Sequence, residues 1–575
     1  MRYRTALKAG LVMVAAHAVQ AHAQDPATKE RQARIDALEA EVRRLEAGLA
    51  QLPRIEAELA ELRRADHAGE ARSAATASAS LAPPAGAARQ QSDAPTTGST
   101  AEVANGVPGT SGGTPAQAAA SPHARIFGPA TPSTAAVSRI DAGHPVIATT
   151  DGRFTASLIG IMQFDVADYF QKRPGPLNVD LRRAGAAGDT ARARNLSDGS
   201  TFRRARIGIA GKAFGDFEYS VLFDFGGSGE EDNGHVQELW LQYSGWKPAH
   251  FRVGAFAPFI GLEDAGSSNG MMFLERPASA DIARSIAGGD YREAGQVAFT
   301  GRRWFASAAI TGRLVNTTGS STVQPYESQL GFIGRAGVLP VKTDAGVVHL
   351  GVHGSYVEHP ANTGGPDATG ATALSPVQFR ERPELRVDGT RLIDTGAIDA
   401  SHAYSAGAEF AAQHKNFLIQ GEYERMGIER RNSALPDPHF HGYYVEGSWM
   451  ITGERRRYND GNYAFDGPTV KGSFNPATGN FGAWELALRW SDMDLNYHQG
   501  VQGFAAPLGG VRGGEQKILT VGVNWYLNSI ARIMFDYQHV NVDHLSPNPA
   551  TFQTPLGAAV GQRYSTGSVR FQLAF

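Results

Sequence analysis

The amino-acid sequence predicts an all-β protein, a transmembrane antiparallel β-barrel of about sixteen strands with an N-terminal α-helical coiled-coil segment and a disordered linker. Short segments after residue 150 alternate apolar and polar side chains with the period of two of a β-strand. Their polar face repeatedly carries Arg, Glu, Gln and Asp, with no sign of an apolar inner face. Such a face suits the wall of a water-filled barrel and not the packed core of a β-sandwich.

The first 150 residues divide into three parts. Residues 1–23 have the basic start, apolar run and Ala21-His22-Ala23 cleavage site of a secretory signal peptide. Residues 24–65 carry apolar residues at spacings of three and four, which predicts a self-associating coiled coil, or alternatively an amphipathic helix lying on the barrel or a membrane. Residues 66–150 are rich in Ala, Ser, Thr, Gly and Pro and read as a flexible linker. Residues 151–575 would form the barrel.

Composition excludes several classes of function. The formal net charge of −3 lacks the basic excess of a nucleic-acid-binding protein. The absence of cysteine excludes disulfides and thiolate metal sites, and it is compatible with export through an oxidising periplasm. We identify no catalytic constellation, so we expect no enzymatic activity, cofactor or metal site. The predicted location is the outer membrane of a Gram-negative cell, in contact with its lipid.

Individual strands can be located from the alternation of side chains. Gly215-Asp216 and Asn528-Ser529 separate two pairs of these segments and are typical of tight turns. Tyr and Trp recur near segment ends, as in the aromatic girdles of membrane barrels. The predicted strands are residues 156–169, 202–214, 217–225, 236–243, 251–257, 417–423, 443–451, 484–490, 519–527, 531–540 and 565–575.

Several motifs resemble a known family, the phosphate-selective porins O and P of Gram-negative outer membranes. The resemblance implies a sixteen-stranded trimeric porin whose loops fold inward and narrow the pore. The sequence departs from the family at Ile161 and Ala255, where phosphate-specific members carry arginine, so the identity of the anion stays open. The motifs are FRRA from Phe202, GLE from Gly261 with Ser267-Ser268, FLER from Phe273, the run from Phe379 to Gly396, GYYVEGSWMITGE from Gly442, GAWEL from Gly482 and VGVNWY from Val521.

The same resemblance implies an anion-binding constriction. It places Arg203 and Arg204 in the pore with the acidic neighbour Asp224, and the polar faces of the predicted strands add Arg206 and Arg252. Guanidinium groups are always charged and can replace part of the hydration shell of a phosphate. Alternatively, the first three arginines pair with carboxylates across the wall in a purely structural lattice.

Two functions follow as hypotheses. The first is a channel for passive diffusion of small anions, with phosphate or polyphosphate as candidates and lumen arginines as the binding groups. The second is a trimeric envelope tether with a non-selective pore, whose coiled coil contacts peptidoglycan. The heptads and the long linker motivate the second hypothesis.

Overall fold

The computed structural model describes residues 135–141, 143–171, 195–227, 234–289, 292–315, 328–362, 373–547 and 555–575. The predicted signal peptide and coiled coil lie outside the described residues, as does the linker up to residue 134. Residues that were expected to end the linker form a hairpin of β1 (Ala136–Asp141) and β2 (His144–Thr149), and β2 pairs with β3. Among the described residues, no helix is both long and apolar enough to cross a membrane.

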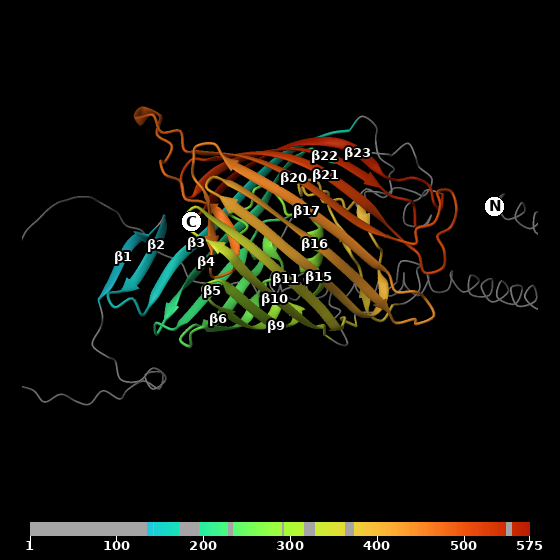
Figure 1. Ribbon diagram of the computed structural model, residues 1–575, viewed down its shortest axis with the longest axis horizontal. Helices are drawn as coiled ribbons and strands as arrows, with labels where there is room; N and C mark the ends of the chain where they lie inside the picture. The colour runs from blue at the N-terminus through green and yellow to red at the C-terminus, as the bar shows by residue number, and fades with distance from the viewer. Residues whose placement is uncertain are drawn as a thin grey trace, which may run out of the picture. The chain divides into compact units, whose positions relative to one another are not determined.

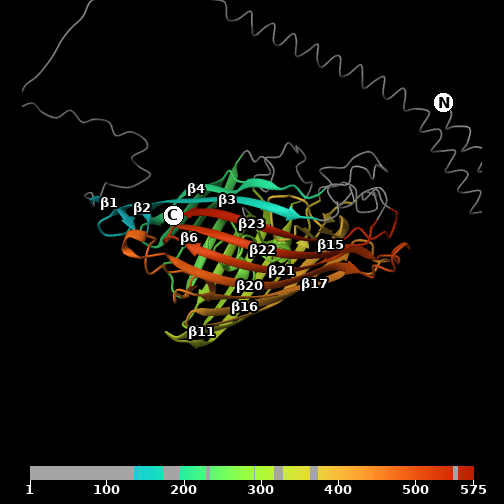
Figure 2. The same cartoon turned by 90° about the horizontal axis from the view of Figure 1, so that it is seen from above.

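Sixteen antiparallel strands close into a barrel, as predicted. Each strand pairs with the next along the chain, and the last, β23, pairs with the first, β3, beside which it lies in both views (Figures 1 and 2). The strands are β3 (Thr155–Phe170), β4 (Gly199–Ala213), β5 (Phe217–Asp224), β6 (His235–Tyr243), β7 (Ala249–Phe256), β8 (Arg292–Thr300), β9 (Trp304–Leu314), β10 (Leu330–Lys342), β11 (Gly346–His359), β15 (Ile398–His414), β16 (Phe417–Arg430), β17 (His439–Met450), β20 (Ala483–Tyr497), β21 (Val511–Tyr526), β22 (Ala531–Asp543) and β23 (Gln562–Ala574).

The side chains of the strands alternate as a membrane barrel requires. On β21, Leu519 and Val521 are exposed on the outer face, whereas Thr520 and Asn524 are completely buried on the inner face. Trp484 and Trp525 stack at a centroid distance of 5.1 Å near the ends of their strands. The apolar face therefore meets lipid and the polar face meets the lumen, with aromatic residues near the boundary.

All of the short turns lie at one end of the barrel, and most of the long connections lie at the other; the exception is the connection of residues 451–482 between β17 and β20, which leaves the end with the short turns. The turn between β4 and β5 spans only Phe214 to Asp216, with positive φ at Phe214 and Gly215, and β21 joins β22 through Asn528-Ser529. Both predicted turns are confirmed. The connections after β3, β7, β11 and β22 are much longer and all leave the other end. Porins have this asymmetry, with short periplasmic turns and long extracellular loops.

At the end with the long connections, two of them fold into the barrel. The first, residues 257–291, carries α4 (Leu262–Ala265) and α5 (Ala278–Ala287) and is called the first inward loop below; α5 contacts β10, β11, β15, β16, β17 and β20. The second inward loop, described at residues 360–362 and 373–397, carries β12 (Pro376–Val377), β13 (Arg380–Glu381) and β14 (Ile393–Asp394). The connection between β17 and β20 carries β18 (Arg456–Asn459), β19 (Ala464–Pro468) and the 3-10 turn η5 (Pro476–Thr478).

The inward loops bury an apolar cluster against the barrel wall. Ile282 of α5 and Phe379 of the second inward loop pack in one cluster with Met426, Phe440 and Met493, which lie on β16, β17 and β20. The expectation of a wall without any apolar inner face is therefore wrong over this region. A loop that leaves solvent needs apolar surface to pack against, because burial of that surface drives its docking.

Candidate functional site

A bulge in β4 turns two consecutive arginines toward the lumen. Gln163 pairs with Arg204 and the next residue, Phe164, pairs with Phe202, so Arg203 is the extra residue in the ladder. Strict alternation would point Arg203 at the lipid, but a bulge places neighbouring residues on one face. Phe202 remains exposed on the outside, while Arg204 is buried on the inside. The bulge explains how adjacent arginines can both serve the pore.

These arginines line a cavity of about 300 Å³ between the β4–β6 wall and the inward loops, called the basic cavity below. Seven arginines line it, whereas two of its described lining residues are acidic, Asp224 and Asp281. Four of the five residues predicted from sequence therefore lie together. The arginines are Arg203, Arg204 and Arg206 from β4, Arg276 and Arg284 from the first inward loop, Arg292 from β8 and Arg386 from the second inward loop.

The three β4 arginines differ in their partners. Arg206 donates from Nε to Asp224 at 2.6 Å, as in the structural-lattice alternative. Arg203 donates from Nε and Nη2 to Glu275 of the first inward loop at 2.7 and 3.1 Å. Arg204 donates from Nη1 to Gln163 at 2.6 Å, and its buried Nε has no hydrogen-bond partner among the described residues. Among the three β4 arginines, Arg204 is thus the one whose Nε remains available to donate a hydrogen bond to an anion.

Arg386 ties the second inward loop to the first. Its Nη2 lies 2.6 Å from Asp281 of α5, and its Nε lies 3.2 Å from Glu275. Burial would lower the pKa of Arg386, but the carboxylates of Glu381, Asp281 and Glu275 raise it above its ordinary value. The guanidinium is therefore fixed in place and always charged.

Arg252 lies away from the basic cavity. On β7, it donates from Nε to Gln242 at 2.9 Å, and its guanidinium carbon lies 4.2 Å from the centre of the Trp240 ring. A cation resting on an aromatic face is stabilised by the electrons of the ring. The structure therefore separates Arg252 from the other residues expected to bind the anion.

Sequence reasoning missed four of the seven arginines. Arg276, Arg284 and Arg386 come from the two inward loops, and Arg292 opens a strand that was not located. Two of them stand in quoted motifs, Arg276 after Phe273-Leu274-Glu275 and Arg386 in the run that starts at Phe379. Their proximity to β4 depends on how the loops fold, which side-chain alternation does not report.

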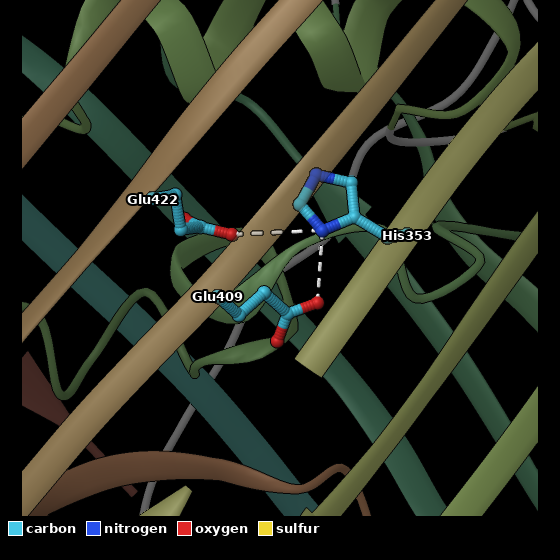
Figure 3. Close-up of side chains that lie close together, drawn as sticks. All are labelled: His353, Glu409 and Glu422. Atoms are coloured by element: carbon cyan, nitrogen blue, oxygen red, sulfur yellow. Dashed lines mark hydrogen bonds and ion pairs between the residues drawn. The ribbon is translucent and has the colours of Figure 1, made fainter. Parts of the chain in front are cut away.

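A second polar cluster holds the first inward loop against the opposite wall. Figure 3 shows His353 of β11 pointing toward Glu409 and Glu422, with Nδ1 at 2.9 Å from Glu409 and 4.0 Å from Glu422. Its Nε2 lies 2.5 Å from Glu424. Imidazole and carboxylates are metal ligands, and these three residues are close enough to share an ion. However, both ring nitrogens already bond carboxylates, and Glu422 accepts from the backbone of the loop, so the cluster works as a hydrogen-bonded anchor.

The spacing of a nucleophile elbow occurs once in the first inward loop. Gly266, Ser268 and Gly270 match the Gly-x-Ser-x-Gly pattern, which sequence analysis had not singled out. The pattern needs a strand before the serine and a helix after it. Here Ser268 follows the short helix α4 and lies in a turn, so the structural context of the motif is missing.

Comparison with known proteins places this barrel in a family. The model of the family described as phosphate-selective porin O and P matches residues 179–572. The chain belongs to this porin family. Porin O of Pseudomonas aeruginosa is 26% identical to this porin over 413 residues, which cover 70% of the chain and 86% of that protein. The protein is accordingly a channel of the outer membrane, and the recognition made from the motifs is confirmed.

Solved structures resemble this porin at low sequence identity. OmpT, an outer membrane protein of Vibrio cholerae, superposes with a TM-score of 0.41 at 10% identity, covering 74% of this chain and 98% of its own. An anion-selective porin from Comamonas acidovorans gives a TM-score of 0.40 at 11% identity, covering 73% and 100%.

Proposed function

We propose that this porin passes small anions and that the basic cavity is the place where it selects them. The observation that carries the proposal is the excess of seven arginines over two aspartates around one cavity in the lumen. Arginine stays charged at every physiological pH and offers several donors in a planar fork, which matches phosphate and other oxyanions. The description of the family as phosphate-selective makes phosphate the first anion to test.

Confinement decides how much these charges matter to a passing ion. Two unit charges 4 Å apart interact by about 1 kcal/mol in bulk water, but by about 4 kcal/mol at the effective dielectric near a protein surface. In a wide aqueous pore, screening over about 8 Å would weaken each arginine at physiological salt. The inward loops bring Arg276, Arg284 and Arg386 to the β4 arginines and so narrow the lumen at this point. The narrowing supports the larger of the two energies for an anion in the basic cavity.

We also propose that the porin works as a homotrimer surrounded by outer-membrane lipid. One of the similar structures, OmpT of Vibrio cholerae, is described in a trimer form. The exposed apolar faces of the strands supply the surface for both lipid and neighbouring subunits. Contact between the N-terminal segment and peptidoglycan stays a prediction from sequence.

The test uses purified porin in planar lipid bilayers. Reversal potentials in KCl gradients report charge selectivity, and addition of phosphate or pyrophosphate reports binding as a block of chloride current. We expect anion preference, and we expect Arg204→Ala to reduce it more than Lys212→Ala does. Lys212 is half-exposed beside the short turn after β4 and does not line the basic cavity. Lys212→Ala is therefore the control, because it also removes one positive charge.

The outcomes separate the parts of the proposal. Cation preference in the wild-type channel would remove the anion function. Equal effects of the two variants would place the selective region somewhere other than the basic cavity. Anion preference without block by phosphate or pyrophosphate would leave an anion channel with a different substrate.

A further inference from the structure

Glu275 occupies a cage of three arginines at the edge of the basic cavity. Its Oε1 accepts from Arg203 at 2.7 Å and from Arg570 of β23 at 2.9 Å, and its Oε2 lies 3.1 Å from Arg203 Nη2 and 3.2 Å from Arg386 Nε. The four segments that meet here are two wall strands and the two inward loops. Glu275 is thus a carboxylate of the chain itself, bound where guanidinium groups converge.

The arrangement resembles a site with its anion already in place. The Glu275 side chain is 3% exposed, whereas those of Arg203 and Arg386 are 13% and 17% exposed and line the basic cavity. Glu275 takes both Nε and Nη2 of Arg203, which is the two-pronged geometry that an oxyanion would use. Arg203 and Arg386 therefore line the cavity with donors that Glu275 already engages.

The charge on Glu275 is permanent under physiological conditions. Burial would raise the pKa of this carboxyl, but the guanidinium groups of Arg203, Arg570 and Arg386 hold it well below its ordinary value. Its field therefore offsets one of the surrounding positive charges at any pH at which the cell lives. Replacement by glutamine removes that charge with little change of shape.

We propose that Glu275 is a specificity-determining residue, a built-in competitor that holds Arg203 and Arg386 away from passing anions and keeps their binding weak. The inference rests on the proposed anion channel, whose selective region it refines. A channel must release an ion as well as attract it, so a site that binds too tightly conducts slowly. Glu275 tunes this balance by engaging two of the seven arginines.

The variant Glu275→Gln tests the inference. The freed donors and the lost negative charge should lower the phosphate concentration that half-blocks chloride current by about tenfold. Conductance in phosphate as the only anion should fall, because release becomes slower. If Glu275 served only to position the arginines, block would weaken instead of tightening, and the proposal would be overturned.

The matched control is Glu485→Gln. Glu485 is also fully buried and also accepts from both Nε and Nη2 of an arginine, Arg456, at 2.7 and 2.8 Å, but neither residue lines the basic cavity. This control loses the same charge and should leave phosphate block within about twofold of wild type. Equal tightening in both variants would reveal a general effect of lumen charge and would overturn the specific role of Glu275.

Two further results keep the test decisive. Should Glu275→Gln fail to form channels, Glu275→Asp keeps the charge but shortens the reach to the arginines, and block should tighten to an intermediate degree; unchanged block would overturn the inference. If phosphate blocks the wild-type channel and blocks Glu275→Gln equally well, this inference is refuted and the proposed anion channel is not. Wild-type channels that prefer cations refute the proposed function itself.

Discussion

Arg570 on β23 and Asp165 on β3 face each other across the seam that closes the barrel. Their Cα atoms are direct partners in the ladder, and Nε and Nη2 of Arg570 each lie 2.6 Å from a carboxylate oxygen of Asp165. Both side chains are fully buried. A two-pronged pair has one geometry, and a slip of β23 by one residue would turn Arg570 to lipid while Asp165 stayed in the lumen, so the pair fixes the register of closure.

Removal of one partner should weaken the closed barrel. Asp165→Ala leaves the guanidinium of Arg570 buried with only part of its carboxylate contacts, and loss of one partner of a buried pair typically costs about 3–5 kcal/mol. We expect the free energy of unfolding to fall by about 3 kcal/mol, because Glu275 still contacts Arg570. Urea-induced unfolding in lipid vesicles, followed by tryptophan fluorescence, measures the change.

A matched control is the exposed pair of Arg313 and Glu293. These side chains are about half exposed and 3.1 Å apart, so Glu293→Ala should change the free energy of unfolding by about 0–1 kcal/mol. A loss in Asp165→Ala no larger than in this control would mean that the seam pair does not hold the barrel closed.

Glu422 should control the diameter of the pore. Its carboxylate accepts from the backbone nitrogens of Leu262 and Glu263 at 2.5 and 3.1 Å, where the first inward loop docks on β16. Glu422→Ala leaves these buried donors without acceptors, and each such group costs about 1–3 kcal/mol. We therefore expect the loop to detach, single-channel conductance to rise with more noise, and anion selectivity to drop in bilayer recordings.

Tyr444→Phe provides the control for this prediction. Its hydroxyl donates to Glu422 at 2.7 Å, so the variant removes one bond to the same carboxylate and leaves both bonds to the loop in place. Conductance should stay close to wild type. Wild-type conductance in Glu422→Ala would show that other contacts suffice to hold the loop.

Arg252 should be dispensable for anion binding, in contrast to the expectation from sequence. It rests on Trp240 and bonds Gln242, outside the lining of the basic cavity. Arg252→Ala should leave phosphate block within about twofold of wild type, because a guanidinium held by Trp240 and Gln242 supplies no donor to the cavity. Titration of chloride current with phosphate measures the block. If phosphate block weakened as much in Arg252→Ala as in Arg204→Ala, Arg252 would belong to the anion-binding site after all.

Much of the barrel could be read from the chain because lipid and water impose opposite demands on alternate residues. Strands with large outward side chains, such as Phe223 or Leu519, stand out by their alternation. Strands β8 to β11 and β15 were not located, since glycine and alanine fill many of their positions and weaken the contrast. Their number was still predictable, because the remaining length requires them.

The candidate site was predictable only where it lies on strands. Arg204, Arg206 and Asp224 sit on inward-facing positions, and alternation alone places Arg204 and Arg206 together. The inward position of Arg203 was predicted only from the resemblance to a family, because the alternation of side chains does not reveal the bulge that turns it inward. Glu275 and Arg386 meet through two loops about a hundred residues apart, and no local pattern encodes that contact.

The contact between the inward loops should lose its stabilising effect in acid. Burial would raise the pKa of Asp281, but Arg386, Arg276 and Arg284 hold it below its ordinary value of 3.8. A carboxyl whose pKa is lower in the folded state adds stability above its unfolded pKa and loses it as the pH falls through the folded pKa. The difference in free energy of unfolding between wild type and Arg386→Ala should therefore stay constant from about pH 8 to about pH 5 and shrink below about pH 4. Urea unfolding at each pH measures it, with Arg313→Ala as the control that shows little difference at any pH. A difference that grows toward acid would mean that Arg386 stabilises the loops through packing and not through its pairing with Asp281.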